Sequence, residues 1–166
     1  MIRKIKDIVL KIIYILITIY LLIFIPSFWG HKPLVVISGS MEPVLKVGGI
    51  LYYHEEKIEN FEEEDILVYE LNDHIISHRI VEKEDSTFLT KGDANESIDT
   101  YFVNENQVLG KGTNWSIPYI GYYADFIYHH KYLLFISIGI IIIDLFYDYY
   151  NAKKKKEGVN NNEKNT

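Results

Sequence analysis

Three short motifs contain residue types that could carry out nucleophilic and acid–base chemistry. They are SGSMEP at residues 38–43, SHRIV at residues 77–81 and TKGDANESID at residues 90–99. A serine hydroxyl is a poor nucleophile until a base removes its proton, and a neutral histidine can be that base near neutral pH. A carboxylate on the second ring nitrogen would orient the imidazole and stabilise its charged form. The motifs therefore contain the side chains that nucleophilic catalysis by a hydroxyl group requires, provided that the fold brings them together.

Each motif taken alone also fits an ordinary structural role. A glycine between two serines permits a tight turn, so the first motif is typical of a polar turn after a strand. A histidine within a β run is commonly a half-exposed strand residue. The carboxylates of the third motif are typical of a solvated loop. A catalytic and a structural interpretation thus stay open for each motif on its own.

Other chemistries have little support in the sequence. The 166 residues include no cysteine, which excludes disulfides, thiolate metal sites and a cysteine nucleophile. The net charge of −6 argues against a nucleic-acid partner. His74 and His78 have the spacing of zinc ligands on a helix, but on a strand they lie about 13 Å apart. No phosphate-binding glycine loop is present, so we expect neither a metal nor another cofactor.

Charge divides the chain into an acidic middle and two basic flanks. Residues 31–130 contain 7 basic and 18 acidic side chains, a net charge of −11. The two flanks together contain 10 basic and 5 acidic side chains, a net charge of +5. Hydrophobicity changes at the same boundaries, which predicts that the flanks and the middle occupy different environments.

The N-terminal flank contains an apolar run that is long enough to cross a membrane. Ile12 to Gly30 is a stretch of 19 uncharged residues, and at about 1.5 Å per residue it reaches about the 30 Å of a bilayer core. Four basic residues precede the run. A cleavable signal peptide would end in small residues, whereas Pro26 to Gly30 follow here. The pattern predicts an uncleaved signal anchor with Trp29 at the membrane interface.

The C-terminal flank contains a shorter apolar run. Tyr132 to Ile143 has 12 uncharged residues before Asp144, a length that is also typical of an interfacial or buried helix. Further apolar and tyrosine residues extend the run, and four lysines at residues 153–156 follow it. We expect a second transmembrane helix. Because basic flanks tend to stay in the cytoplasm, two spans would leave both termini cytoplasmic and the acidic middle extracytoplasmic.

The acidic middle has the pattern of β structure. Its apolar runs are 4 to 7 residues long, rich in β-branched and aromatic residues, and separated by turn-forming or charged clusters. These runs are Leu34–Ile37, Ile50–Tyr53, Ile66–Tyr69, Ile75–Val81 and Thr87–Thr90. No ten-residue segment of the middle shows sustained helical periodicity. We therefore expect a mainly β domain, with one sheet or a partial barrel, flanked by N- and C-terminal transmembrane helices.

In their order and with these neighbours, the three motifs closely resemble signal peptidase I of the endoplasmic-reticulum, archaeal and sporulation-associated bacterial type. That family consists of membrane-bound serine proteases that remove signal peptides from exported preproteins. The resemblance covers residues 10–145 and is most specific in the first motif. It implies a signal-peptidase-like β fold and a serine endopeptidase activity.

The resemblance also implies roles for individual residues. Ser40, directly before a methionine, matches the nucleophile, and His78 matches the general base of this branch. Asp99 is favoured as the triad acid, and Asp93 is a second important carboxylate that stays a competitor for that role. The backbone N–H of Ser40 and the hydroxyl of Ser38 resemble the oxyanion donors of the bacterial relatives.

The expected substrate agrees with the expected topology. A signal peptide has an apolar stretch in the bilayer and a cleavage site at its outer surface, and Ser40 follows the first span by ten residues. We expect preprotein signal peptides and the lipid bilayer as partners, with secretion-machinery partners unspecified. Met41, Val44 and Leu45, near the serine, could contact lipid or substrate, or pack in the core. The alternative function is a non-catalytic, membrane-anchored β module that binds extracytoplasmic partners.

These expectations divide the chain into five segments. They are a cytoplasmic basic segment (1–11), a transmembrane signal anchor (12–30), an extracytoplasmic β peptidase domain (31–130), a second transmembrane helix (131–150) and a basic, disordered cytoplasmic tail (151–166).

Overall fold

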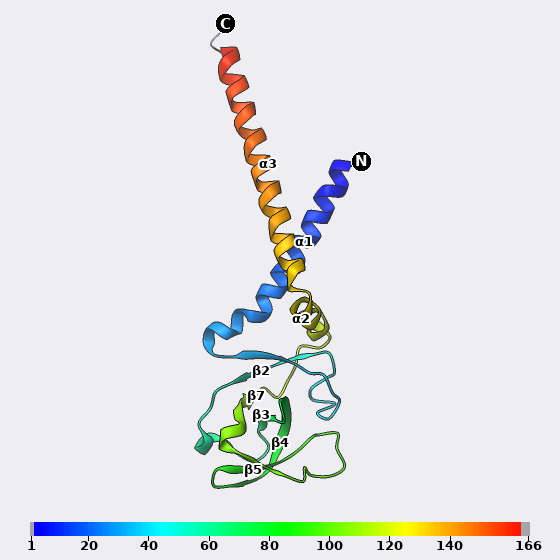
Figure 1. The fold of residues 1–166 in the computed structure, drawn as a ribbon, viewed down its shortest axis with the longest axis vertical. Helices are drawn as coiled ribbons and strands as arrows, with labels where there is room; N and C mark the ends of the chain where they lie inside the picture. Colours follow the sequence, from blue (N-terminus) through cyan, green and yellow to red (C-terminus); the bar gives the residue numbers. More distant parts are fainter. Residues whose placement is uncertain (1, 164–166) are drawn as a thin grey trace. The chain divides into compact units, whose positions relative to one another are not determined.

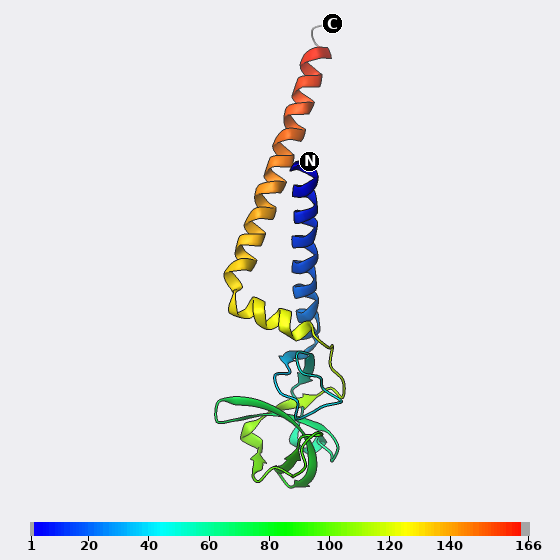
Figure 2. The same cartoon turned by 90° about the vertical axis from the view of Figure 1, so that its right-hand side faces the viewer.

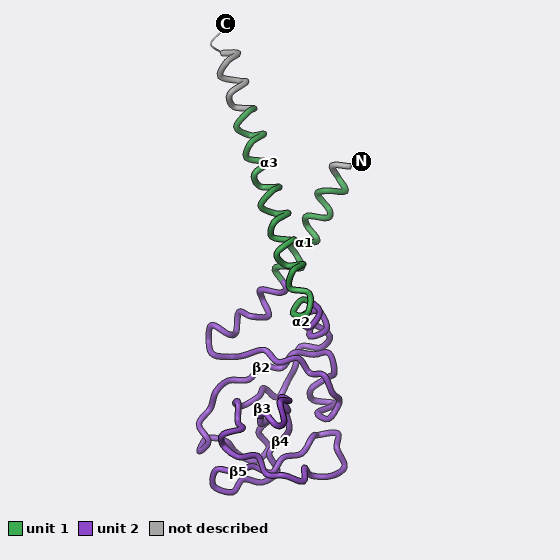
Figure 3. Tube along the Cα trace, in the orientation of Figure 1, with its two compact units in different colours: residues 1–18, 127–166 green, residues 19–126 purple. Residues whose placement is uncertain are grey.

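The structure, a computed structural model, describes the backbone of residues 2–163 and the side chains of residues 4–154. The chain forms two compact units (Figure 3). Met1–Thr18 and Ile127–Thr166 make up the first, which we call the helical unit, and Ile19–Phe126 make up the second, the sheet unit. Each unit is described by itself below.

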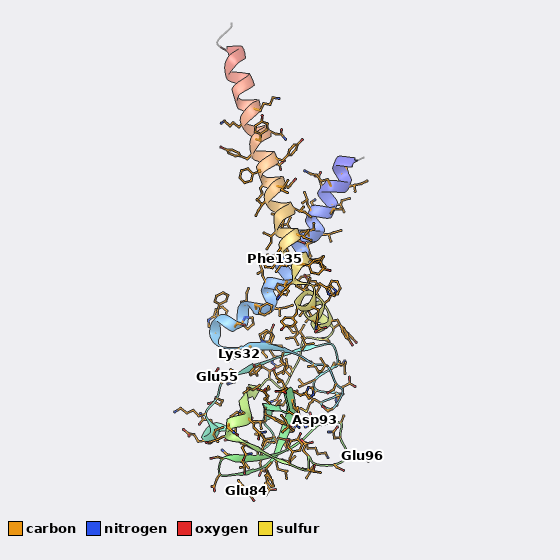
Figure 4. All side chains as sticks on the ribbon, viewed as in Figure 1. Lys32, Glu55, Glu84, Asp93, Glu96 and Phe135 are labelled. Atoms are coloured by element: carbon orange, nitrogen blue, oxygen red, sulfur yellow. The ribbon has the colours of Figure 1, made fainter. Side chains whose placement is uncertain are left out.

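Within the described residues, two helical segments are long and apolar enough to cross a membrane, Lys4–Trp29 and Lys131–Lys154. The first consists of α1 (Ile2–Phe24) and the 3-10 helix η1 (Ile25–Trp29), and the second belongs to α3 (Lys131–Glu163). The most apolar stretch of α3 has no residue buried by protein, and Phe135 is 69% exposed (Figure 4). An apolar helix that protein leaves uncovered is typical of a segment in contact with lipid.

The helix α3 extends further than the sequence predicts. It continues to Glu163, through most of the tail that we expected to be disordered from residue 151. The alanine, lysines and glutamate at residues 152–157 favour helix and lengthen one that has already formed. Residues 164–166 of the expected tail lie outside the described residues.

The sheet unit contains one seven-stranded sheet that curls on itself (Figures 1 and 2). The strand order is β1-β2-β7-β3-β4-β5-β6, and every pair of neighbours is antiparallel. The strands are β1 (Lys32–Val35), β2 (Ile50–His54), β3 (Ile66–Leu71), β4 (His74–Glu84), β5 (Thr87–Lys91), β6 (Phe102–Asn104) and β7 (Val108–Gly112). Two short 3-10 helices, η2 (Ile58–Asn60) and η3 (Glu105–Gln107), lie in connections. The predicted mainly β fold with flanking apolar helices is confirmed.

Two strands and one α-helix were not predicted from the sequence. β6 has only three residues, and two of the five residues of β7 are glycines, which weaken the pattern of a strand. β7 nevertheless lies inside the sheet, because it pairs with both β2 and β3. The ten-residue helix α2 (Ile120–His129) lies within the segment that we expected to be β. Its aromatic residues are weak helix formers and are typical of strands.

The core lies on both faces of β3. Ile66 and Val68 pack in one hydrophobic cluster, whereas Leu67 and Tyr69 pack in another, because successive residues of a strand point to opposite faces. Met41 and Leu45 belong to the cluster of Ile66 and are 1% and 0% exposed. Of the two roles left open for these residues, the structure thus supports core packing.

Candidate active site

The serine motif forms a turn that is anchored in the core and open to solvent on the other side. It follows β1, and the N–H of Glu42 donates to the carbonyl of Gly39 at 3.0 Å to close the turn. The fully buried Met41 holds the turn against the sheet, while its neighbour Ser40 is partly exposed. The local sequence thus places a serine hydroxyl at the surface on a fixed support.

The histidine of the second motif meets this serine. His78 lies in β4, opposite Leu67 of β3, and is 8% exposed. Its Nε2 lies 3.1 Å from the Ser40 hydroxyl oxygen, and its Nδ1 lies 2.7 Å from Oδ2 of Asp99. A carboxylate only accepts hydrogen bonds, so the Nδ1 proton faces Asp99 and Nε2 is free to accept from the serine. The three side chains therefore form one continuous hydrogen-bonded chain.

The carboxylate of Asp99 is held by a second side chain. Thr90, in β5, donates its hydroxyl proton to the same Oδ2 atom at 2.7 Å. The backbone N–H of Asp99 also donates to the carbonyl of Thr90 at 2.9 Å. Asp99 is thus fixed by both its main chain and its side chain, with its carboxylate directed at the imidazole.

The second carboxylate of the motif, Asp93, has a different partner. Arg79 donates from Nε to Oδ1 and from Nη2 to Oδ2 of Asp93, each at 2.7 Å. These charge-assisted bonds raise the pKa of Arg79 above its ordinary value. Arg79 follows His78 in β4, and consecutive strand residues point to opposite faces. The strand therefore directs the side chains of His78 and Arg79 to two different carboxylates.

A close backbone approach joins the third motif to the first. The N–H of Ala94 donates to the carbonyl of Ser40 at 2.8 Å. A Cβ atom on Gly92 would lie 2.6 Å from the same carbonyl oxygen, so only glycine permits this packing. All three motifs predicted from the sequence thus meet at one place.

Comparisons with known proteins identify relatives of this chain. No family model matches the sequence. The signal peptidase complex catalytic subunit SEC11 of Candida albicans (strain WO-1) is 32% identical over 130 residues, covering 68% of this chain and 75% of that protein. The chain belongs to the signal peptidase I family. The subunits of the same name from Chaetomium globosum (32% over 121 residues, 64% and 70% covered) and Zygosaccharomyces rouxii (30% over 128 residues, 68% and 75%) are also similar.

Family membership confirms the predicted class of enzyme. The chain is a serine protease of the signal peptidase I type, and its two apolar helices agree with association with a membrane. The alternative of a non-catalytic binding module is therefore not supported.

The two expected oxyanion donors of this signal peptidase lie beside the serine hydroxyl. The hydroxyl oxygen of Ser38 is 3.3 Å from that of Ser40, and Ser38 is exposed. Among the described residues, the backbone N–H of Ser40 has no hydrogen-bond acceptor. The N–H of Ser40 thus has a proton available for a bound substrate. Because the Ser40 hydroxyl donates to His78, Ser38 donates in the bond between the two serines, and its proton would have to turn from Ser40 to a substrate.

Two side chains that hold the carboxylates of this site were not predicted from the sequence. Thr90 and Arg79 stand inside the third and second motifs, but no spacing rule assigned them a partner. Without the register of the sheet, the sequence gives only weak signals for these roles. One is a buried threonine in a β strand, and the other is an arginine directly after the histidine of the second motif. As for metals, no group of three or more histidine or acidic side chains is close enough to hold an ion within the part of the chain that the structure describes.

Proposed function

We propose that this signal peptidase cleaves the signal peptides of exported preproteins at the outer surface of the membrane, with Ser40 as nucleophile, His78 as general base and Asp99 as the acid that orients the base. The hydrogen-bonded chain from Ser40 through both nitrogens of His78 to Asp99 carries this proposal. A signal peptide presents its cleavage site at the membrane surface. A protease with apolar flanking helices is suited to meet it there.

The chemistry follows from the proton positions. Ser40 Oγ attacks the scissile carbonyl carbon while Nε2 of His78 takes its proton, and the imidazolium is stabilised by Asp99. His78 then gives this proton to the leaving amine, and a water molecule hydrolyses the acyl-enzyme by the reverse transfer. The N–H of Ser40 and the hydroxyl of Ser38 donate to the oxyanion, and one such donor contributes about 3 to 4 kcal/mol.

Asp93 has a supporting role in this proposal. Both of its carboxylate oxygens bind Arg79, which also donates from Nη1 to the carbonyl of Glu64 at 2.6 Å. The ion pair joins the loop of the third motif to β4, and thereby holds Asp99 near His78. Asp93 is then a positioning residue of the site.

The membrane arrangement of the five segments is part of the proposal. The basic segments 1–11 and 151–166 lie in the cytoplasm, segments 12–30 and 131–150 cross the membrane, and the acidic peptidase domain 31–130 is extracytoplasmic. The charge asymmetry of the chain supports this topology. The names of the relatives describe subunits of a signal peptidase complex, and we propose that this chain also works with partner subunits.

The test is cleavage of a preprotein by the detergent-solubilised full chain. We expect Ser40→Ala to lower kcat by at least about 1,000-fold, because no other hydroxyl replaces the nucleophile. Ser86→Ala, in the turn between β4 and β5, is the matched control and should cleave at the normal rate. Equal processing by wild type and Ser40→Ala would overturn the proposal.

A further inference from the structure

A row of three hydroxyl groups leads away from the Asp99 carboxylate into the sheet. Thr90 bonds to Asp99 at 2.7 Å, the phenol oxygen of Tyr69 lies 3.2 Å from the Thr90 hydroxyl, and the phenol oxygen of Tyr101 lies 3.0 Å from that of Tyr69. Thr90 and Tyr69 are 0% exposed. None of the three is hydrogen-bonded to Ser40, so the chemistry proposed above does not use them directly.

The direction of every proton in this row follows from a simple count. A carboxylate only accepts, and each hydroxyl has one proton to donate. Thr90 gives its proton to Asp99, so the bond between Tyr69 and Thr90 is donated by Tyr69. Tyr69 has then used its proton, so Tyr101 must donate to Tyr69. All three protons therefore point toward the carboxylate.

This arrangement of donors is suited to hold the charged carboxylate of Asp99 in one orientation. Oδ2 of Asp99 accepts from His78 on one side and from Thr90 on the other. Burial raises the pKa of Tyr69 far above its ordinary value, so its phenol keeps its proton. In a site with little water, such a chain of hydrogen bonds is polarised along its length and each bond strengthens the next.

We propose that Thr90 is a positioning residue for the triad carboxylate, and that Tyr69 and Tyr101 fix the direction of its hydroxyl. This inference rests on the proposed roles of Ser40, His78 and Asp99. Thr90 acts through Asp99: it keeps Oδ2 facing Nδ1 of His78 while the imidazole gains and loses a proton. Loss of the hydroxyl would leave the carboxylate free to turn away from the base.

The experiment compares threonine variants of one strand in the preprotein cleavage assay. Thr90→Val has nearly the same shape but no hydroxyl, and we expect a fall in kcat of about 10-fold to 100-fold with KM unchanged. Thr90→Ser retains the donor and should restore most of kcat. The control is Thr87→Val, also in β5, whose hydroxyl bonds to the carbonyl of Glu84 and not to the site. It should leave kcat unchanged.

The outcomes separate this inference from the proposed function. If Ser40→Ala is inactive but Thr90→Val turns over like Thr87→Val, the positioning role is wrong and the triad stands. If Thr90→Ser is as slow as Thr90→Val, the effect is one of packing and the inference also fails. If Ser40→Ala processes normally, the proposed function itself fails.

A second variant decides the matter if Thr90→Val does not fold. Tyr69→Phe keeps the ring in the core and removes only the phenol, so the Thr90 hydroxyl loses the donor that directs it. We expect a smaller fall in kcat, about threefold, with KM unchanged. A kcat equal to that of wild type in folded Tyr69→Phe would overturn the proposed row of donors.

Discussion

At the scale of single residues, the two carboxylates of the third motif have different partners although they are only six positions apart. Asp99 accepts from the imidazole of His78 and from Thr90, whereas Asp93 forms a two-point ion pair with Arg79. A carboxylate that is hydrogen-bonded to a general base affects the rate of the reaction. A carboxylate in an ion pair affects mainly the stability of the loop. Substitution should therefore separate the two roles.

We predict that Asp99→Asn lowers kcat by about 1,000-fold to 10,000-fold, because an amide favours the wrong tautomer of His78 and does not stabilise the imidazolium. Asp93→Asn should lower the free energy of unfolding by about 1 to 3 kcal/mol, because it removes the nearest counter-charge of the mostly buried Arg79 and leaves the more distant Glu64. We expect a smaller fall in kcat. Turnover and thermal unfolding are measured on both variants. If Asp93→Asn had the larger loss of kcat at normal stability, Asp93 would be the triad acid.

At the scale of secondary-structure elements, the start of α2 is packed against the end of the segment that carries the serine motif. The N–H of Gly121 donates to the carbonyl of Gly48 at 2.9 Å. Gly48 also connects the two ends of this segment, which runs from Val36 to Gly48. Its N–H donates to the carbonyl of Val36 at 2.8 Å. The helix α2, which was not predicted from the sequence, thus closes the loop that carries Ser40.

We predict that Gly121→Ala destabilises the sheet unit by about 1 to 3 kcal/mol, because overpacking against a rigid backbone forces the chain apart. The added Cβ would lie 2.5 Å from the carbonyl oxygen of Gly49. Thermal unfolding and turnover should both decrease. The matched control is Gly139→Ala in α3, where an added Cβ meets nothing within 4 Å. Unfolding of Gly121→Ala at the wild-type temperature would show that this contact does not hold the loop.

At the scale of the whole molecule, the charged residue that interrupts the second apolar run has a partner in the helical unit. Asp144 of α3 forms an ion pair with Lys6 of α1, and the Lys6 ammonium also lies 5.5 Å from the ring centre of Tyr147. A charged side chain in or near a bilayer is costly unless it is paired. This pairing agrees with the proposal that α3 crosses the membrane.

The absence of cysteine allows a direct test of the proposed topology. A single cysteine at the exposed Glu96 of the sheet unit (Figure 4) should react with a membrane-impermeant maleimide in intact cells. A single cysteine at Asn151 should react only after the membrane is permeabilised, because two spans would leave it in the cytoplasm. The unmodified chain is the blank. Labelling of Asn151→Cys in intact cells would contradict a C-terminus in the cytoplasm.

Local patterns were sufficient for much of the architecture. Five of the strands and both apolar helices follow from run length, alternation and turn residues, because these signals depend only on near neighbours in the chain. The motifs around Ser40 and His78 were recognisable for the same reason. β7 was not, because its five residues include two glycines, and its place in the sheet depends on pairing with β2 and β3.

The sequence by itself determined which residue types are present for catalysis and that the nucleophile must be a hydroxyl, since the chain has no thiol. It favoured Asp99 as the triad acid but left Asp93 as a competitor for that role. Only the tertiary structure decided that Asp99 faces His78, because this depends on the pairing of β4 with β5 and on which face of β4 each side chain occupies. The supporting hydroxyl groups of Thr90 and Tyr69 also come from different strands. Their alignment follows from the register of the folded sheet, which no local pattern contains.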